Sequence, residues 1–337
     1  MNLMNFFKQP FDSKTKHSQV NIVLYHDDCL DGFMTMYILK SSFEKIGQNV
    51  VCIPVKYHFP PPFEKIKATT KNRENVNLII ADFCYKSEEL TEIAKFVDVM
   101  TILDHHDTAA TNHGGYGFKK ISLVKCRCSD IHLKLIEGQS GATLAYDYVS
   151  KFTMVKPIVY EFALGVEDHD LWNFTFESTP AIVELLVGLV RTYEAWEEFF
   201  RQDKSDILEM LKQASIKVGY RKQVVESYVA KATLVTFEGH LVPFVNCSHD
   251  YASYVGQALY AKYPFAFMYE FTGNSKVRDS KLNCVRVSLR SDNKTGMDIT
   301  SIAEKYNGGG HKHSAGFYID IYQFTEIIKN SQEMKHD

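Results

Sequence analysis

The chain has 337 residues, of which 45% are hydrophobic and 23% charged, so it can bury a sizeable core and general disorder is excluded. This length exceeds the needs of one small core and favours two domains. Thirty-eight Lys and Arg residues against 41 Asp and Glu residues give a net charge of −3, which argues against a basic surface that grips long duplex nucleic acid. A small positive pocket for a short phosphorylated ligand is compatible with this balance.

Targeting and redox features favour the cytoplasm. The longest apolar runs fall short of a membrane span, and the first 11 residues do not have the pattern of a secretory signal. The seven cysteines are odd in number and show no paired spacing, which is typical of a reduced intracellular protein. We therefore expect a cytoplasmic protein with no membrane partner.

The first half of the chain alternates short, β-branched runs with segments of helical periodicity. Strands are predicted over 20–25, 50–55, 77–81 and 97–103, and helices over 33–46, 87–96, 141–152 and 156–165. Residues 57–73, with three prolines at 60–62, are expected to be a surface excursion. Strand–helix alternation of this kind predicts the α/β class, in which a parallel sheet has helices on both faces.

The second half is expected to be organised differently. Residues from about 180 to 232 are charged and helix-periodic, and they are followed by predicted strands over 233–237, 241–246, 265–271 and 284–290 with a helix over 253–262. These patterns predict a smaller α+β domain. The expected boundaries are 1–185 for the α/β domain, 186–232 for a helical connector and 233–337 for the smaller domain.

Polar residues gather where predicted strands of the first half end. They are His26, Asp27, Asp28 and Asp31 after the first strand, Asp82 after the third, and Asp104, His105, His106 and Asp107 after the fourth. Asp168 and Asp170 form a further cluster before Trp172. Because ligands of an open parallel sheet bind beyond the carboxyl ends of its strands, three of these clusters are expected to converge. Each cluster alone is explained by a helix cap or a turn, but four together are not.

Carboxylates and imidazoles gathered at one point favour divalent cations, because unpaired carboxylates there would repel one another. Mixed oxygen and imidazole ligation without a thiolate suits manganese, magnesium or iron(II). Two such ions would activate a bridging water and clamp a phosphoryl group for in-line attack.

The ordered set of motifs resembles the DHH family of phosphoesterases that carry a C-terminal DHHA1 domain, in particular members acting on short oligonucleotides. The resemblance is carried by residues 26–32 (HDDCLDG), 82, 104–106 (DHH), 168–172 (DHDLW), 288–291 (SLRS) and 308–316 (GGGHKHSAG). Order and spacing match from about residue 20 to 320. One departure lies in the first motif, where one residue more than in the family pattern separates the two candidate aspartates.

The resemblance implies a site for two manganese ions, with magnesium or another divalent metal as an alternative. The implied metal ligands are His26, Asp28, Asp31, Asp82, His105 and Asp168. Asp82 would bridge the metals. The implied catalytic group is Asp104, His105 and His106, in which Asp104 orients the imidazoles and His106 either binds metal or faces the substrate phosphate. Asp27 stays an alternative to Asp28, and Asp170 to Asp168.

The C-terminal glycines are expected to bind substrate. Three glycines let backbone N–H groups approach an anion, the neighbouring histidines can donate to phosphate, and an arginine can make a two-pronged contact. The expected substrate-binding residues are Arg290, Gly308, Gly309, Gly310, His311 and His313. By itself, the triplet is better explained by a flexible turn after a predicted helix over 299–306, but Arg290 upstream and a metal site elsewhere favour a substrate-binding domain.

The resemblance implies a hydrolase that cleaves short single-stranded oligonucleotides or linear dinucleotides to 5′-mononucleotides. Within the same enzyme class, the alternatives are a phosphomonoesterase acting on a nucleoside 3′,5′-bisphosphate and a cyclic-dinucleotide phosphodiesterase. From another class, a nucleotide-binding regulatory protein on a degenerate scaffold is supported only by the altered first motif. A homodimer is left open.

Overall fold

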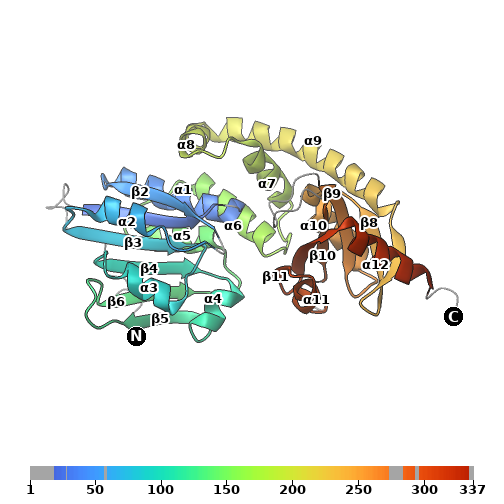
Figure 1. Cartoon of the computed structure of the whole chain (residues 1–337). Helices are drawn as coiled ribbons and strands as arrows, with labels where there is room; N and C mark the ends of the chain where they lie inside the picture. The colour runs from blue at the N-terminus through green and yellow to red at the C-terminus, as the bar shows by residue number, and fades with distance from the viewer. Residues whose placement is uncertain (1–18, 28, 57–58, 273–283, 293–295, 334–337) are drawn as a thin grey trace. The chain divides into compact units, whose positions relative to one another are not determined.

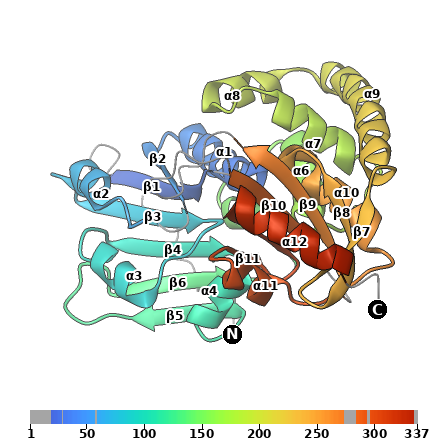
Figure 2. The ribbon, with the colours of Figure 1, turned by 45° about the vertical axis from the view of Figure 1, so that its right-hand side comes forward.

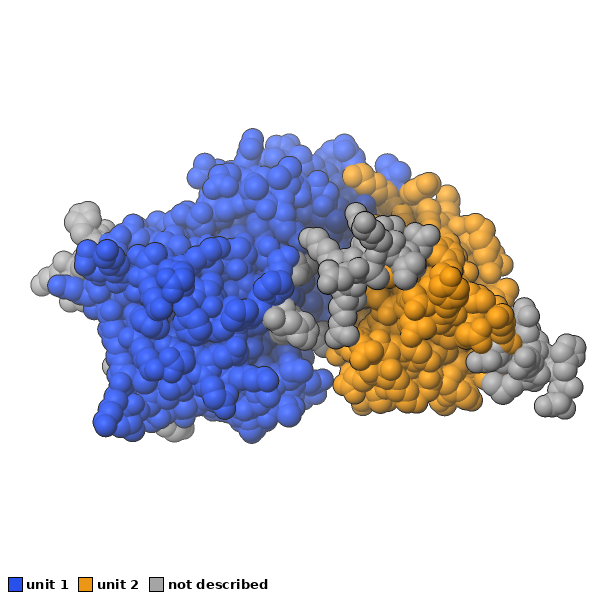
Figure 3. All heavy atoms as spheres, in the orientation of Figure 1, with its two compact units in different colours: residues 1–216 blue, residues 217–337 orange. Residues whose placement is uncertain are grey.

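The computed structural model describes residues 19–27, 29–56, 59–272, 284–292 and 296–333. The chain divides into two compact units, residues 1–216 and 217–337, and the division falls inside helix α9 (Lys204–Val229) (Figure 3). Each unit contains one six-stranded sheet (Figure 1). Within the described residues, no helix combines the length and the apolar character needed to cross a bilayer.

Unit 1 is built on a largely parallel sheet. Its strands are β1 (Gln19–His26), β2 (Val50–Val55), β3 (Asn75–Ala81), β4 (Val99–Asp104), β5 (Gly117–Ser122) and β6 (Asp130–Leu135). Its helices are α1 (Leu30–Lys45), α2 (Phe63–Thr70), α3 (Ser87–Ile93), α4 (Asp107–Asn112), α5 (Gly141–Val149), α6 (Pro157–Asp170), α7 (Thr179–Gly188), α8 (Tyr193–Arg201) and the first part of α9. The strand order is β2-β1-β3-β4-β6-β5, and β5, at one edge, is antiparallel to β6.

Helices cover both faces of this sheet (Figures 1 and 2). In β1, Val23 packs with the core beneath α1, α5 and α6, whereas Ile22 and Leu24 pack with the core beneath α2 and α3. This alternation follows from the two-residue period of a strand, and a sheet buried on both faces requires apolar residues at nearly every position. The structure therefore confirms the predicted α/β class.

The sequence analysis did not predict every element of unit 1. Helix α2 lies within residues 57–73, which were expected to be a surface excursion, and β5 and β6 were not assigned at all. Strand β5 alternates half-buried with exposed residues and carries two lysines, so its pattern is weak. Strand β6 alternates Ile131, Leu133 and Leu135 with polar residues, a period-two signal that sequence reasoning missed.

The topology of unit 1 fixes where a ligand can bind. Strand β1 pairs in parallel with β2 on one side and with β3 on the other. The chain thus moves from β1 to one neighbour and then crosses back to the other neighbour, which makes this point a topological switch. A ligand of an open α/β sheet binds beyond the carboxyl ends of the strands at such a point.

Unit 2 is built on a mixed sheet. Its strands are β7 (Thr233–Phe237), β8 (His240–Asn246), β9 (Ala266–Thr272), β10 (Cys284–Arg290), β11 (Gly309–His311) and β12 (Ser314–Asp320), in the order β11-β12-β10-β9-β8-β7. Its helices are the rest of α9, the short 3₁₀ helix η2 (His249–Tyr251), α10 (Ala252–Tyr260), α11 (Thr300–Lys305) and α12 (Ile321–Glu333). Only β8 and β9 pair in parallel among the described strand pairs of this sheet.

The glycine triplet is not a free turn. Gly309 and Gly310 begin β11, which pairs with β12 through Gly309–Gly316 and Gly310–Ala315. Gly310 has a φ of +145°, and a Cβ added there would lie 2.4 Å from the carbonyl oxygen of Ser314. Close contact between two backbones therefore requires glycine at this position.

Candidate metal centre and anion site

The carboxyl ends of β1, β3 and β4 bring three groups of possible metal ligands together in unit 1. They are Asp82 with Asp104, His105 and His106; His26 with Cys29 and Asp82; and Asp31 with His105 and Asp170. In each group, the ligand atoms lie within 4.8 Å of one another. Asp82 and His105 each belong to two groups, so the three form one continuous cluster at the switch point.

Asp82 occupies the centre of this cluster in a strained backbone conformation. It directly follows β3 and has a φ of +54°, in the left-handed region that non-glycine residues rarely adopt. One carboxylate oxygen, Oδ1, lies 3.2 Å from Nε2 of His105, and the other, Oδ2, lies 3.6 Å from Nδ1 of His26. The strain is typical of functional positions, and here it directs both carboxylate oxygens towards imidazoles.

Two glycines permit the close approach of the elements that carry the aspartates. Asp31, in the first turn of α1, accepts hydrogen bonds from the backbone N–H groups of Gly141 and Ala142 at 2.6 and 2.9 Å. A Cβ on Gly141 would lie 2.6 Å from Cβ of Asp82 and 2.9 Å from Oδ2 of Asp31. A Cβ on Gly32 would lie 2.0 Å from the carbonyl oxygen of His26. The sequence analysis had no reason to select Gly141.

The cluster concentrates negative charge in a buried place. Burial, together with repulsion from Asp82 and Asp170, raises the pKa of Asp31 well above its usual range. Burial would also raise the pKa of Asp82, but hydrogen bonds from His105 and His26 outweigh it and lower that pKa. The pKa of His105 rises to about 10, because the surrounding carboxylates outweigh the effect of burial. Three carboxyl groups thus crowd around the imidazole of His105, and a divalent ion would relieve the repulsion among them.

Asp104 holds His106 in place. Its Oδ1 lies 2.7 Å from Nδ1 of His106 and also accepts the backbone N–H of His105 at 2.8 Å. Burial lowers the pKa of His106, but the charge and hydrogen bond of Asp104 outweigh it, so the net pKa is raised. The other oxygen of Asp104, Oδ2, is buried and accepts no hydrogen bond from the described residues. This arrangement fixes the orientation of the His106 ring.

Asp168, the ligand preferred from the sequence, and Asp170, its alternative, take different places. Asp170 joins the cluster, with Oδ2 lying 3.5 Å from Nε2 of His105. The carboxylate of Asp168 instead accepts hydrogen bonds from the backbone N–H groups of Thr175 and Phe176 at 2.8 and 3.1 Å and from the Thr179 hydroxyl at 2.5 Å. These contacts outweigh burial and lower the pKa of Asp168. Asp168 belongs to none of the ligand groups because its oxygens are committed to the turn after α6.

The first motif contributes a cysteine that the sequence analysis passed over. Asp28, the expected ligand, lies outside the described residues, and Asp27 belongs to no ligand group. Cys29 is the N-cap of α1, and its Sγ lies 3.1 Å from Nδ1 of His26 and 3.0 Å from Oδ2 of Asp82. Burial and the charges of Asp82 and Asp31 raise the pKa of this thiol. Its position in the first motif, two residues before Asp31, could have marked Cys29 as a candidate ligand.

Unit 2 contains a polar cluster around the predicted Arg290. The pKa of Arg290 is lowered to about 10, chiefly by burial and also by repulsion from Arg286. Its guanidinium donates to the Ser253 hydroxyl at 3.2 Å and to the carbonyl oxygen of Leu289 at 2.8 Å, and no carboxylate pairs with it among the described ion pairs. A half-buried arginine without a carboxylate partner is suited to an anionic ligand.

Sequence reasoning missed the neighbours of Arg290. Arg286 and Ser288 share its face of β10, and His249 from η2 contacts both, at 2.7 Å to Arg286 and 3.2 Å to Ser288. Opposite Ser288 in β12 stands Gly316, which leaves no side chain on this face. The period-two spacing of Arg286, Ser288 and Arg290 was visible in the sequence, but the approach of His249 was not.

The remaining predicted residues in unit 2 have defined places. Nδ1 of His313 lies 2.9 Å from Oγ of Ser291, and the Ser291 hydroxyl donates to the carbonyl oxygen of Met297 at 2.8 Å. The backbone of His311 pairs with Ser314 in the hairpin of β11 and β12. Gly308 precedes β11, and a Cβ there would lie 2.2 Å from the carbonyl oxygen of Gly316. These residues belong to or flank the hairpin of β11 and β12. Strand β12 begins at Ser314, which pairs with Arg290 of β10.

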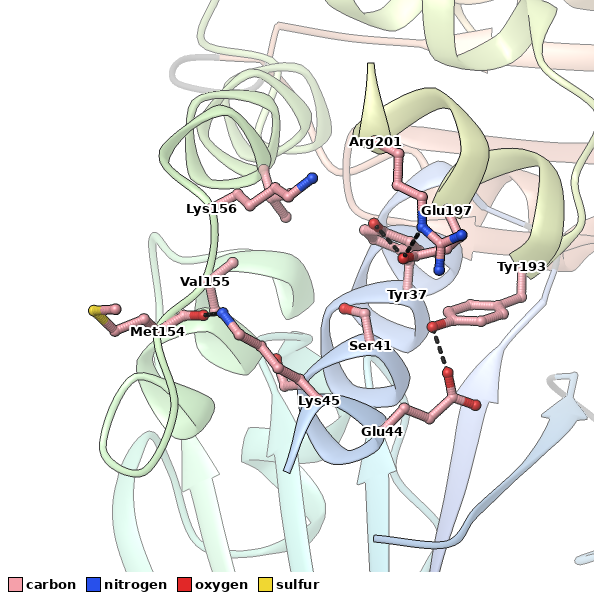
Figure 4. Close-up of a pocket in the computed structure, with 12 residues that line it drawn as sticks. Tyr37, Ser41, Glu44, Lys45, Met154, Val155, Lys156, Tyr193, Glu197 and Arg201 are labelled. Atoms are coloured by element: carbon pink, nitrogen blue, oxygen red, sulfur yellow. Dashed lines mark hydrogen bonds and ion pairs between the residues drawn. The ribbon is translucent and has the colours of Figure 1, made fainter. Parts of the chain in front are cut away.

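A separate surface pocket of about 380 Å³ lies between α1, the 154–156 turn and α8 (Figure 4). Several of its charged lining groups bond to neighbouring side chains or backbone carbonyls. Glu197 accepts from Tyr37 at 3.1 Å and from Arg201 at 2.9 Å, and Lys45 donates to the carbonyl oxygen of Met154 at 2.6 Å (Figure 4). None of its residues belongs to a metal-ligand group. We assign this pocket to the packing of α8, whose Trp196 is fully buried.

The chain is similar in sequence to two known proteins and in fold to a third. No family model matches the chain. The chain is 26% identical over 93% of its length to an uncharacterized protein, R106, of Acanthamoeba polyphaga mimivirus, covering 70% of that protein. It is 23% identical over 89% of its length to oligoribonuclease NrnB of Bacillus subtilis, covering 74% of that protein. An exopolyphosphatase-related protein of Bacteroides fragilis has a similar fold, with a TM-score of 0.50 and 14% identity over 94% of this chain and 92% of that one.

Proposed function

The chain is a homologue of the DHH-family oligoribonuclease NrnB, as its motifs predicted, and we propose that it is a metal-dependent phosphodiesterase of the same family. Its substrates would be short single-stranded oligonucleotides or linear dinucleotides, and its products 5′-mononucleotides. The observation that carries the proposal is the convergence of Asp31, Asp82, Asp170, His26 and His105 at the switch point of the parallel sheet.

The residues of the cluster fit a pair of divalent ions. Three carboxylates lie around one imidazole, and a buried oxygen of Asp104 accepts no hydrogen bond from the described residues. Oxygen and imidazole donors are the ligands that manganese and magnesium accept. Asp82, shared by two ligand groups, would lie between the ions. When bound, two divalent ions would lower the pKa of a water and neutralise charge developing on the phosphoryl group.

The chain's own groups would supply orientation and protons. Asp104 fixes the ring of His106 through Nδ1, and His106 would act as the proton donor to a phosphoryl or leaving oxygen. The raised pKa of His106 favours the protonated form that such a donor needs. Asp31 caps α5 through two backbone N–H groups, which holds its carboxylate in one orientation. Such fixed donors and acceptors lower the reorganisation needed in the transition state.

Arg290 would bind a phosphate group of the substrate. Its guanidinium is half-buried and lacks a carboxylate partner among the described ion pairs, and Arg286 and His249 lie nearby. An arginine can make a two-pronged contact to a phosphate. The net charge of −3 leaves little general attraction for long nucleic acid, in agreement with a short substrate.

Hydrolysis of a 5′-phosphorylated diribonucleotide with added manganese tests the proposal. We expect 5′-mononucleotides from the intact chain and a loss of at least about a thousandfold in rate for His105→Ala, which removes a group central to the cluster. The matched control His240→Ala replaces a histidine of β8 that belongs to no ligand group, and it should retain activity. Separation of products on an anion-exchange column measures both. An intact chain that binds manganese and leaves di- to pentanucleotides whole would contradict the proposal.

A further inference from the structure

The first motif places a sulfur atom inside the cluster. Sγ of Cys29 lies 3.1 Å from Nδ1 of His26 and 3.0 Å from Oδ2 of Asp82, and these two partner atoms lie 3.6 Å from each other. Ligand atoms around a tetrahedral zinc ion lie roughly 3.3–3.6 Å apart, as bond lengths of about 2.0–2.3 Å require. The three atoms therefore need only small shifts to surround one ion.

The backbone holds this sulfur in its orientation. Cys29 is the N-cap of the 16-residue helix α1, and its Sγ accepts the backbone N–H of Gly32 at 3.1 Å. A negative sulfur is stabilised at the N-terminus of a helix, where free N–H groups and the helix dipole meet. Gly32 itself is fixed by the close approach of the carbonyl oxygen of His26. The same turn therefore sets both the sulfur and the imidazole.

A second observation indicates that the surrounding cluster is incomplete without a cation. Asp104 is 0% exposed, yet its Oδ2 accepts no hydrogen bond from the described residues. Asp104 and Asp82 belong to one ligand group, and Asp82 also belongs to the group of Cys29. A buried carboxylate oxygen without a partner is costly, and a metal ion nearby removes that cost.

We propose that Cys29 is a thiolate ligand, together with His26 and Asp82, of one divalent ion in this cluster. This inference rests on the proposed metal site and extends it, because sulfur changes which metal that position prefers. On binding, the S–H bond breaks, a bond from Sγ to the ion forms and the proton leaves to solvent. Thiolate ligands favour zinc, cobalt(II) and iron(II) over manganese and magnesium. The chain would thus hold a softer ion at the Cys29 position than its oxygen and imidazole ligands alone would select.

Cobalt(II) provides a direct readout of sulfur ligation that does not depend on catalysis. Titration of the metal-free chain with cobalt(II) should produce the intense near-ultraviolet charge-transfer absorption of a cobalt–thiolate bond. Cys29→Ser should abolish this band. The matched control Cys52→Ser replaces another half-buried free cysteine, on β2 and in no ligand group, and it should keep the band.

A second variant keeps the test decisive if Cys29→Ser folds poorly. Cys29→Asp replaces sulfur by a carboxylate, so it should keep manganese binding while its preference for zinc over manganese falls at least about tenfold, measured by calorimetric titration. Circular dichroism verifies folding of each variant. A wild-type chain that binds cobalt(II) without the thiolate band, or a metal preference unchanged in Cys29→Asp, would overturn the inference. If the thiolate band is absent but the chain hydrolyses a dinucleotide, only the ligation by Cys29 is refuted and the proposed function stands. If the band is present but no dinucleotide is hydrolysed, the proposed function is refuted and Cys29 remains a metal ligand.

Discussion

Separate substitutions of Asp168 and Asp170 test the organisation of the site. The two residues lie two positions apart in α6, yet we expect one substitution to lower stability and the other to weaken metal binding. Asp168→Ala removes the acceptor for Thr175, Phe176 and Thr179, and it should destabilise unit 1 while leaving metal ligation to other residues. Asp170→Asn removes a carboxylate of the cluster, and it should weaken metal binding while leaving the metal-free fold intact.

The magnitudes follow from the contacts. Asp168 is 4% exposed and accepts three hydrogen bonds at 2.8, 3.1 and 2.5 Å. Hydrogen bonds to a charged group contribute roughly 1.5–3 kcal/mol each, and they are not additive within one turn, so we expect Asp168→Ala to cost about 3 kcal/mol. For a unit of this size, that corresponds to a fall in Tm of roughly 6–12 °C. Asp170→Asn relieves repulsion among carboxylates, so the unfolding free energy should change by less than about 0.5 kcal/mol.

Both effects can be measured on the full chain. The two tryptophans, Trp172 and Trp196, both lie in unit 1, so their fluorescence during thermal unfolding in a chelator reports this unit alone. Calorimetric titration with manganese should give an affinity reduced at least about tenfold in Asp170→Asn and nearly unchanged in Asp168→Ala, as far as the latter stays folded. An Asp168→Ala variant with wild-type Tm and the metal affinity of Asp170→Asn would refute the assignment.

The pH dependence of stability provides a further check on Asp168. Its pKa is lowered in the folded chain, because its hydrogen bonds outweigh the effect of burial. A lowered folded pKa adds stability that is fully present above the unfolded value of about 3.9 and is lost as the pH falls through the folded value. The difference in unfolding free energy between wild type and Asp168→Ala should therefore be constant from about pH 5 to 8 and shrink below about pH 4. A difference that grows on acidification would contradict this reasoning.

Three further predictions concern the chemistry. Gly141→Ala would place a Cβ 2.6 Å from that of Asp82, so calorimetry should show manganese affinity reduced at least about tenfold, whereas Gly219→Ala, in open space on α9, should have no effect. Arg290→Lys should raise KM about tenfold with kcat within about twofold in steady-state hydrolysis, and an unchanged KM would remove Arg290 from the substrate site. Asp104→Asn should lower the pKa of His106 and move the alkaline limb of the kcat profile to lower pH, and an unmoved limb would exclude His106 as the proton donor.

Much of the site could be predicted from the sequence, because parallel strands impose a common geometry. Because β1, β3 and β4 are parallel neighbours, their carboxyl ends lie at the same edge of the sheet. Recognising those strands in the sequence was therefore enough to predict that His26, Asp82 and His105 lie close together. The strands themselves were recognisable because both faces of the sheet are buried, which leaves continuous apolar runs in β1 and β3.

The anion site in unit 2 illustrates a limit of this reasoning. Alternation along β10 places Arg286 and Arg290 on one face, which follows from the sequence alone. The contact of His249 with Arg286 joins positions 37 residues apart and depends on how η2 packs beside β9 and β10. Periodicity carries no information on such a contact, since it describes one element at a time.

The fold class of unit 1 and the kinds of ligand expected at its strand ends could be predicted from the sequence, because hydrophobic period and the alternation of strands with helices along the chain are local properties. Tertiary structure alone places Asp170, and not Asp168, beside His105: residues two apart on a helix point to different sides, and the docking of α6 determines which side meets His105. It also decided the place of Cys29, since its sulfur meets Asp82 only when α1 begins beside the end of β3. A contact between distant segments depends on how whole elements pack, and no single stretch of sequence encodes that.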